Sequence, residues 1–178
     1  NPETNEVWAT VPEANDEDVD FAVQSAQRAF DTSWSKLHPR DRAKYLRLIA
    51  NELRNNAEHL GKIETIDTGK LFRETKTQAN YIAEYYDYFA GLADKVEGTV
   101  VPIDKEDMQV TTTRVPIGVV AAIIPWNSQM LLTAVKLAPA LAMGNTVVIK
   151  ASELAPVTLL EFAKLIEKTG IPKGVVNV

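Results

Sequence analysis

Asn127 is an amide side chain that follows the apolar run of residues 119–124, with only Pro125 and Trp126 between them. An amide donates hydrogen bonds without titrating, so this residue type suits the stabilisation of an oxyanion that develops during a reaction. Asn is also one of the residues that best cap a helix, and a helical pattern begins at Ser128. Local sequence alone favours the helix cap over the catalytic role.

Lys150 and Glu153 follow a second apolar run, residues 146–149. Either side chain could hydrogen-bond the hydroxyl groups of a ribose, and a carboxylate at such a place favours a free 2′-hydroxyl over a 2′-phosphate. The alternatives are a surface salt bridge or a carboxylate at a helix start. Lys136 lies on the helix expected after Asn127, and taken alone it is an ordinary solvated lysine.

Several classes of site and partner are excluded by composition. The chain has no cysteine and two histidines, so disulfides, cysteine nucleophiles and thiolate or histidine-rich metal sites cannot form within it, and no metal is predicted. The net charge of -5 argues against a nucleic-acid partner. No apolar run is long enough to cross a membrane, and no signal peptide is recognisable, so a cytoplasmic location is expected.

Residues 117–178 alternate between apolar runs and helical patterns, as a parallel α/β unit does. Strands are expected at residues 119–124, 146–149 and 174–178, and helices at 128–143 and 156–169. The continuous apolar character of residues 119–124 predicts a strand buried on both faces. Parallel strands joined by right-handed crossovers end at one edge of the sheet, so Asn127, Lys150 and Glu153 should converge there.

The first 116 residues are expected to be mostly helical. A helix capped by Asp16 or Glu17 should run through Phe30, one long helix should cover about residues 39–68, and an aromatic helix should cover 72–95. Strands at 99–102 and 108–115 can pair as a projecting hairpin, which either serves oligomerisation or is a plain surface hairpin. We therefore divide the chain into an arm with helices (1–98), the hairpin strands (99–116) and an incomplete NAD-binding unit (117–178).

Taken together, the segments resemble the aldehyde dehydrogenase superfamily, and the resemblance covers nearly the whole chain. Each segment is a weak signal by itself, but their order and spacing are specific. One departure is Asn5, which stands where the family's opening motif has Gly. The matching segments are residues 1–7 (NPETNEV), 64–70 (ETIDTGK), 88–91 (YFAG), 114–119 (RVPIGV), 124–127 (IPWN), 136–142 (KLAPALA), 144–150 (GNTVVIK) and 170–177 (GIPKGVVN).

This resemblance implies an α/β fold of the variant Rossmann type that lacks the usual glycine fingerprint, and NAD as cofactor, with NADP possible. In the family a cysteine thiolate attacks an aldehyde to form a thiohemiacetal, hydride passes to the nicotinamide, and water activated by a glutamate releases the acid. Asn127 matches the family asparagine that binds the oxyanion, and Lys136 matches a lysine near the proton-relay route. Residues matching the cofactor cleft are Ile124, Pro125, Trp126, Lys150, Ser152 and Glu153.

Two departures limit what the resemblance implies. Ser128 and Gln129 stand where Phe-Pro is common, which alters the mouth of the substrate tunnel. The nucleophilic cysteine, the general-base glutamate and the glycine-rich phosphate loop lie in the family beyond the position of Val178. The chain is therefore expected to be the amino-terminal part of an aldehyde dehydrogenase that is inactive alone, and a homodimer or homotetramer in complete form. The alternatives are a non-catalytic truncated nucleotide-binding or assembly module, and a reductase of an activated acid.

Overall fold

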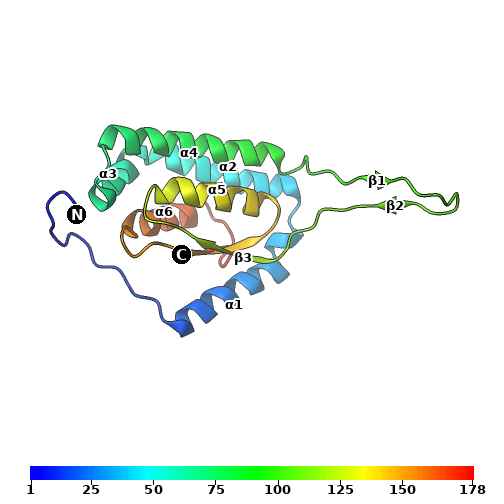
Figure 1. The fold of residues 1–178 in the computed structure, drawn as a ribbon, viewed down its shortest axis with the longest axis horizontal. Helices are drawn as coiled ribbons and strands as arrows, with labels where there is room; N and C mark the ends of the chain where they lie inside the picture. Colours follow the sequence, from blue (N-terminus) through cyan, green and yellow to red (C-terminus); the bar gives the residue numbers. More distant parts are fainter.

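The structure is a computed structural model that describes all residues from 1 to 178. Its helices and strands form layers around a small parallel sheet (Figure 1). The helix α1 packs on one face of the sheet and α5 packs on the other, while α2 and α4 form a further layer against α5. The elements are α1 (Asp16–Thr32), the 3-10 helix η1 (Trp34–Lys36), α2 (Pro39–Asn55), α3 (Ala57–Thr68), α4 (Phe72–Leu92), β1 (Val100–Val101), β2 (Val110–Thr111), β3 (Val119–Ile123), α5 (Gln129–Ala142), β4 (Thr146–Lys150), α6 (Val157–Lys168) and β5 (Val176–Asn177).

The cap of α1 differs from the expected one. Asn15, and not Asp16 or Glu17, is the N-cap: its side chain accepts hydrogen bonds from the backbone nitrogens of Glu17 and Asp18, and the Asp18 carboxylate accepts one from the Asn15 backbone nitrogen. This reciprocal pair is a capping box, which satisfies backbone donors that a helix start leaves free. With an amide at position 15 as the cap, the acidic residues that follow lie in the first turn, where their negative charges interact favourably with the positive end of the helix dipole.

The single helix predicted over residues 39–68 is wrong, because the structure divides it into α2 and α3. The break is at Asn56, whose backbone leaves the helical region (φ −114°, ψ 15°). Its side-chain amide donates to the backbone carbonyl of Glu52 at 2.8 Å, which is the local competition that makes Asn a poor residue inside a helix. The predicted stop is confirmed at Gly69, which ends α3 in the left-handed conformation (φ 76°).

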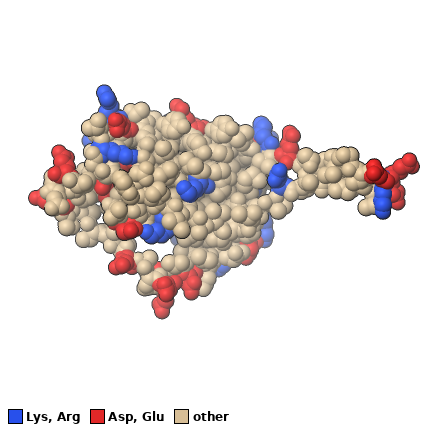
Figure 2. Space-filling view, in the orientation of Figure 1, with Lys and Arg blue, Asp and Glu red and all other residues tan.

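The strands β1 and β2 pair antiparallel, as predicted, and the hairpin they form projects away from the body of the molecule (Figure 1). Both strands are shorter than expected and are exposed along their length. Gly98 is required at the base, because a Cβ there would lie 1.9 Å from the backbone oxygen of Thr112. Figure 2 shows charged side chains of both signs gathered at the tip of this hairpin. A role in oligomerisation stays a prediction.

The sheet contains three parallel strands in the order β3-β4-β5. The central strand β4 is mostly buried, but the prediction that β3 is buried on both faces is wrong. Ala122 is buried whereas Ala121 and Ile123 are exposed, because side chains alternate along a strand and no helix of this chain covers that end of the second face.

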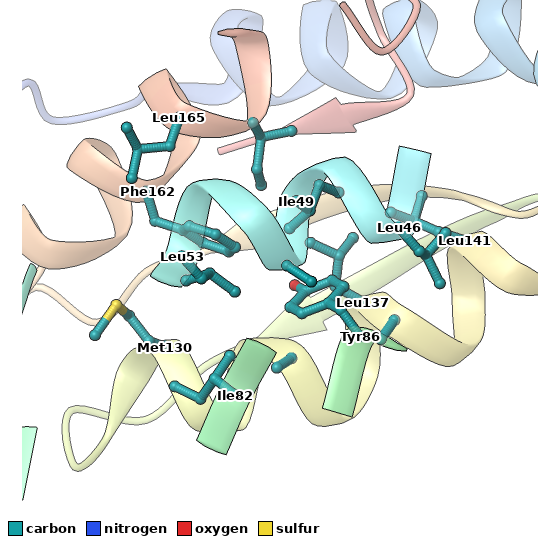
Figure 3. Close-up of a cluster of buried hydrophobic side chains, with 14 of the residues drawn as sticks. Leu46, Ile49, Leu53, Ile82, Tyr86, Met130, Leu137, Leu141, Phe162 and Leu165 are labelled. Atoms are coloured by element: carbon teal, nitrogen blue, oxygen red, sulfur yellow. The ribbon is translucent and has the colours of Figure 1, made fainter. Parts of the chain in front are cut away.

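One hydrophobic core joins the helices of the first 98 residues to the α/β unit (Figure 3). Leucine, isoleucine and aromatic side chains of α2, α4, α5 and α6 meet in it, and Tyr86 of α4 packs edge-on against Phe162 of α6 with ring centroids 6.2 Å apart. The aromatic pattern of residues 72–95 thus marks core at Tyr86, while Tyr81 and Tyr88 are exposed.

One polar side chain ties the α/β unit to the preceding helices, and another joins two segments within the unit. Asp67 of α3 accepts hydrogen bonds from the backbone nitrogens of Val157 (2.9 Å) and Thr158 (3.3 Å), and so caps the start of α6 from another helix. Asn145 accepts from the backbone nitrogens of Ile117 and Gly118 at the entrance to β3. No helix of the structure has both the length and the apolar character needed to pass through a membrane.

Candidate functional site

The carboxyl ends of β3 and β4 lie side by side, as the sequence predicts. Ile123 is in register with Lys150, and the backbone nitrogen of Ile124 donates to the backbone oxygen of Lys150 at 3.0 Å. The segments that carry Asn127 and Glu153 therefore leave the sheet from the same edge. This edge is where ligands bind in open parallel sheets.

Asn127 does not cap α5, so the reading favoured by local sequence is wrong. The N-cap is Ser128, which adopts the left-handed conformation (φ 59°, ψ 53°) and makes no side-chain capping bond. This conformation is uncommon outside glycine, and it moves the helix start one residue past Asn127. Asn127 is exposed and its amide forms no hydrogen bond within the chain, so the group is free to bind a ligand.

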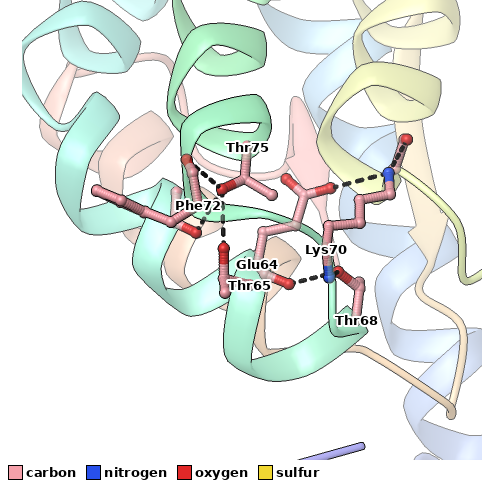
Figure 4. Close-up of polar contacts among 8 residues, drawn as sticks. Glu64, Thr65, Thr68, Lys70, Phe72 and Thr75 are labelled. Atoms are coloured by element: carbon pink, nitrogen blue, oxygen red, sulfur yellow. Dashed lines mark hydrogen bonds and ion pairs between the residues drawn. The ribbon is translucent and has the colours of Figure 1, made fainter. Parts of the chain in front are cut away.

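Ser128 is held by a side chain that sequence reasoning did not single out. The ammonium group of Lys70, between α3 and α4, donates to the Ser128 hydroxyl, although 58 residues separate the two (Figure 4). The same ammonium lies 3.9 Å from a carboxyl oxygen of Glu64. The local sequence does not predict these contacts, because they depend on how the loop between α3 and α4 reaches the start of α5.

Glu64 is an acidic side chain with no exposed surface, and neither of its carboxyl oxygens accepts a hydrogen bond. Burial raises its pKa from 4.5 to about 7, and the nearby charge of Lys70 opposes this rise. The dominant cause is the cost of moving a carboxylate out of water. Near neutral pH, Glu64 is therefore divided between its charged and its neutral form.

Gln129 ties the first turn of α5 to the segment after β4. Its side chain is buried, and its amide oxygen accepts a hydrogen bond from the backbone nitrogen of Ser152 at 3.3 Å. Ser152 is also buried, and its hydroxyl accepts from the backbone nitrogen of Leu154. The two segments that leave the sheet edge are thus joined to each other directly.

Lys150 and Glu153 form a surface ion pair, which the sequence left open as an alternative to binding a ribose. Their charged atoms are 2.7 Å apart, and hydrogen bonding to Lys150 lowers the pKa of Glu153. Both side chains are exposed, so the pair contributes little to stability and either member is accessible to a ligand.

The remaining predicted residues are divided between core and surface. The side chain of Ile124 is buried in the core, which leaves its backbone to face the edge of the sheet, while Pro125 and Trp126 are exposed. Lys136 is exposed further along α5, with its ammonium 3.5 Å from the backbone oxygen of Leu132. Lys136 lies nine positions after Asn127, and no hydrogen bond joins the two. The roles of these residues stay predictions.

A separate hollow of about 460 Å³ lies away from Asn127, between the amino-terminal arm and the start of α6. Trp8 and Val11 line it from the arm, and Asp67 and Glu153 line it from the opposite side. It meets the predicted site only at Glu153. The predicted oxyanion and ribose contacts depend on the edge of the sheet and not on this hollow.

Comparison with known proteins assigns the chain to a family. The model of the aldehyde dehydrogenase family matches residues 1–178. The chain is similar to (Z)-2-((N-methylformamido)methylene)-5-hydroxybutyrolactone dehydrogenase of Acinetobacter baylyi, at 57% identity over 100% of this chain and 37% of the relative. It is also similar to betaine aldehyde dehydrogenase of Bacillus subtilis, at 43% identity over 99% of this chain and 36% of the relative.

A solved structure agrees with the fold. The crystal structure of a point variant of betaine aldehyde dehydrogenase from Staphylococcus aureus, in complex with NAD⁺, superposes with a TM-score of 0.95 at 39% identity. The match covers 99% of this chain and 36% of that one. The chain therefore spans little more than a third of the length of the relatives that it matches.

Proposed function

The chain belongs to the aldehyde dehydrogenase family, and from this premise we propose that it is the amino-terminal part of an enzyme that oxidises an aldehyde to a carboxylic acid with NAD⁺. NADP⁺ is the alternative cofactor. Residues 1–178 contain no cysteine, so the nucleophile of the proposed reaction belongs to sequence outside them. Residues 1–178 alone are expected to give no turnover.

The observation that carries this proposal is the free amide of Asn127 at the edge of the sheet. When a nucleophile adds to the carbonyl carbon of the aldehyde, negative charge develops on the carbonyl oxygen. An N–H of Asn127 donates to that oxygen. Because the helix cap is at Ser128 and the amide has no partner in the chain, no internal hydrogen bond has to break first.

The cofactor side of the proposal is supported by the exposed pair after β4. A ribose presents neighbouring hydroxyl groups, for which Glu153 supplies acceptors and Lys150 supplies donors, and both side chains are accessible. Ser152 fixes the turn between them, and the backbone of Ile124 to Trp126 would lie along the other side of the cleft. The residues present therefore fit a nucleotide. When bound, NAD⁺ supplies the acceptor for the hydride that leaves the aldehyde carbon.

The test uses the protein made from the complete reading frame that contains residues 1–178. Its production of NADH from a panel of aldehydes is compared with that of Asn127→Ala. Losing one oxyanion donor costs roughly 2.7–4 kcal/mol, so kcat should fall about 10²- to 10³-fold while KM changes little. Asn80→Ala is the matched control, because Asn80 is an exposed asparagine on α4 and its change should leave kcat as it is.

Two results would count against the proposal, and they are distinguishable. If the wild-type protein oxidises no aldehyde with either nicotinamide cofactor, the proposed activity is wrong. If it is active and Asn127→Ala keeps the full kcat, the activity stands and the role of Asn127 is wrong.

A further inference from the structure

Lys70 brings a positive charge to the residue next to Asn127. Gly69 turns the chain out of α3 in the left-handed conformation, and Lys70 then crosses to the start of α5, where its ammonium meets the Ser128 hydroxyl. The side chain of Lys70 is 28% exposed, so one side of it is open. Figure 4 shows Glu64 and Lys70 side by side, with the ammonium of Lys70 reaching away from α3.

The hydrogen-bonding capacity of this group is not filled by the protein. A lysine ammonium has three N–H donors. One of them is used by Ser128, and the carboxyl of Glu64 lies 3.9 Å away, which is an ion-pair distance and too long for a hydrogen bond. The Ser128 hydroxyl accepts from Lys70 and so keeps its own proton to donate. Both groups therefore offer donors at the same place.

The charge of Glu64 also affects how strongly Lys70 can attract a ligand. Because Glu64 is buried and divided between its two forms near neutral pH, it balances the charge of Lys70 only in part. No other carboxylate forms an ion pair with Lys70. A ligand with acceptor oxygens and a negative charge is the chemical match for such a group.

A hollow that could take part of a bound molecule opens near the start of α5, although neither Lys70 nor Ser128 lines it. The hollow lies between α4 and the first turn of α5, with Leu131 on the α5 side, one helical turn past Ser128. Arg73 and Glu74 both line it, and Gln78 contributes a buried amide oxygen that has no hydrogen-bond partner. Four of its six lining residues are polar or charged, although most of the exposed wall is apolar.

We propose that Lys70, with Ser128, binds the carboxylate of a substrate aldehyde that carries an acid group at its far end. The inference rests on the proposed function, because it assigns the carbonyl end of the same molecule to Asn127. The Lys70 ammonium is hydrogen-bonded to Ser128 and neighbouring Cα atoms are about 3.8 Å apart, so the Asn127 amide and the Lys70 ammonium can be separated by at most roughly 12 Å. A four-carbon aldehyde acid, with a hydrogen bond at each end, can span such a separation.

The test compares 4-oxobutanoate with its methyl ester, which has the same chain and no charge. For the complete wild-type protein we expect a higher kcat/KM with the acid. A charge-assisted hydrogen bond contributes about 1.5–3 kcal/mol, so Lys70→Met should lower the ratio of the acid's kcat/KM to the ester's about 10- to 100-fold. Lys70→Arg should restore most of the ratio, and Ser128→Ala should lower it by a smaller factor.

Lys62→Met is the matched control, because Lys62 is an exposed lysine of α3 that pairs with Glu58 on the surface. It should leave the ratio as it is in the wild type. The thermal unfolding of each variant identifies any that fails to fold, and in that case the Ser128→Ala and Lys70→Arg ratios decide.

Three outcomes would overturn the inference. Lys70→Met could lower the kcat/KM of acid and ester equally, which would make Lys70 a structural residue. The wild type could oxidise the ester as well as the acid, or other aldehydes but neither of these two, which would exclude the substrate class. The absence of turnover with every aldehyde would instead show that the proposed function itself is wrong.

Discussion

Replacing Glu64 with Gln removes a buried charge and keeps nearly the same shape. Because the pKa of Glu64 is higher in the folded protein than in the unfolded chain, folding takes up a proton between about pH 4.5 and 7. The stability of the wild-type fold therefore falls as pH rises through this window and levels off above it. Gln has no proton to lose, so Glu64→Gln should not show this fall.

The size of the effect follows from the two pKa values. A change from 4.5 to about 7 corresponds to roughly 3 kcal/mol, at about 1.4 kcal/mol for each pKa unit. Between about pH 4.5 and 8, the unfolding free energy of Glu64→Gln minus that of the wild type should therefore rise by about 3 kcal/mol. Urea unfolding of the complete protein at several pH values measures it.

Glu58→Gln is the matched control on the same helix. Its carboxylate is exposed, and hydrogen bonds from Lys62 and Lys76 lower its pKa, so its contribution to stability is present at neutral pH and is lost as pH falls. Glu58→Gln should therefore lose stability relative to the wild type as pH rises, which is the opposite sign. A stability difference for Glu64→Gln that stays constant with pH would refute the reasoning.

Two other changes test the packing that holds the site. Leu53→Ala should lower the unfolding free energy measured in urea by about 2–5 kcal/mol, because Leu53 is wholly buried between α2 and its neighbours. Leu48→Ala, on the exposed side of α2, should lower it far less. Equal losses would contradict the assigned core. Asp67→Ala should cost about 1–3 kcal/mol and speed amide exchange at the start of α6, because two backbone donors lose their acceptor. Asp67→Asn keeps an acceptor oxygen and should recover most of that loss; no recovery would show that the charge, and not the hydrogen bonds, is what matters.

The order of helices and strands could be predicted from the sequence because apolar spacing is a local property. The parallel strands β3 and β4 were predicted from their apolar runs, and the stop at Gly69 from the conformation that only glycine adopts easily. The break at Asn56 was missed, because the apolar spacing continues through it while a side-chain bond to the backbone ends the helix.

The candidate site likewise has a part that the sequence predicts and a part that it does not. That Asn127 and Lys150 lie at one edge follows from topology, and the structure confirms it. The position of the helix cap could not be predicted, because it depends on the left-handed conformation of Ser128, and the contact of Lys70 with that residue comes from tertiary packing. Local sequence contains neither of these facts.

The projecting hairpin has a consequence for how this chain can diverge over evolutionary time. Its strands are exposed and contribute no side chain to the hydrophobic core, so most substitutions in it leave the folding free energy unchanged. Selection for a stable fold therefore has little effect on residues 100–111, apart from the backbone requirement at Gly98 just before them. The sequence of the hairpin is free to drift, and only a surface that touches it can oppose that drift.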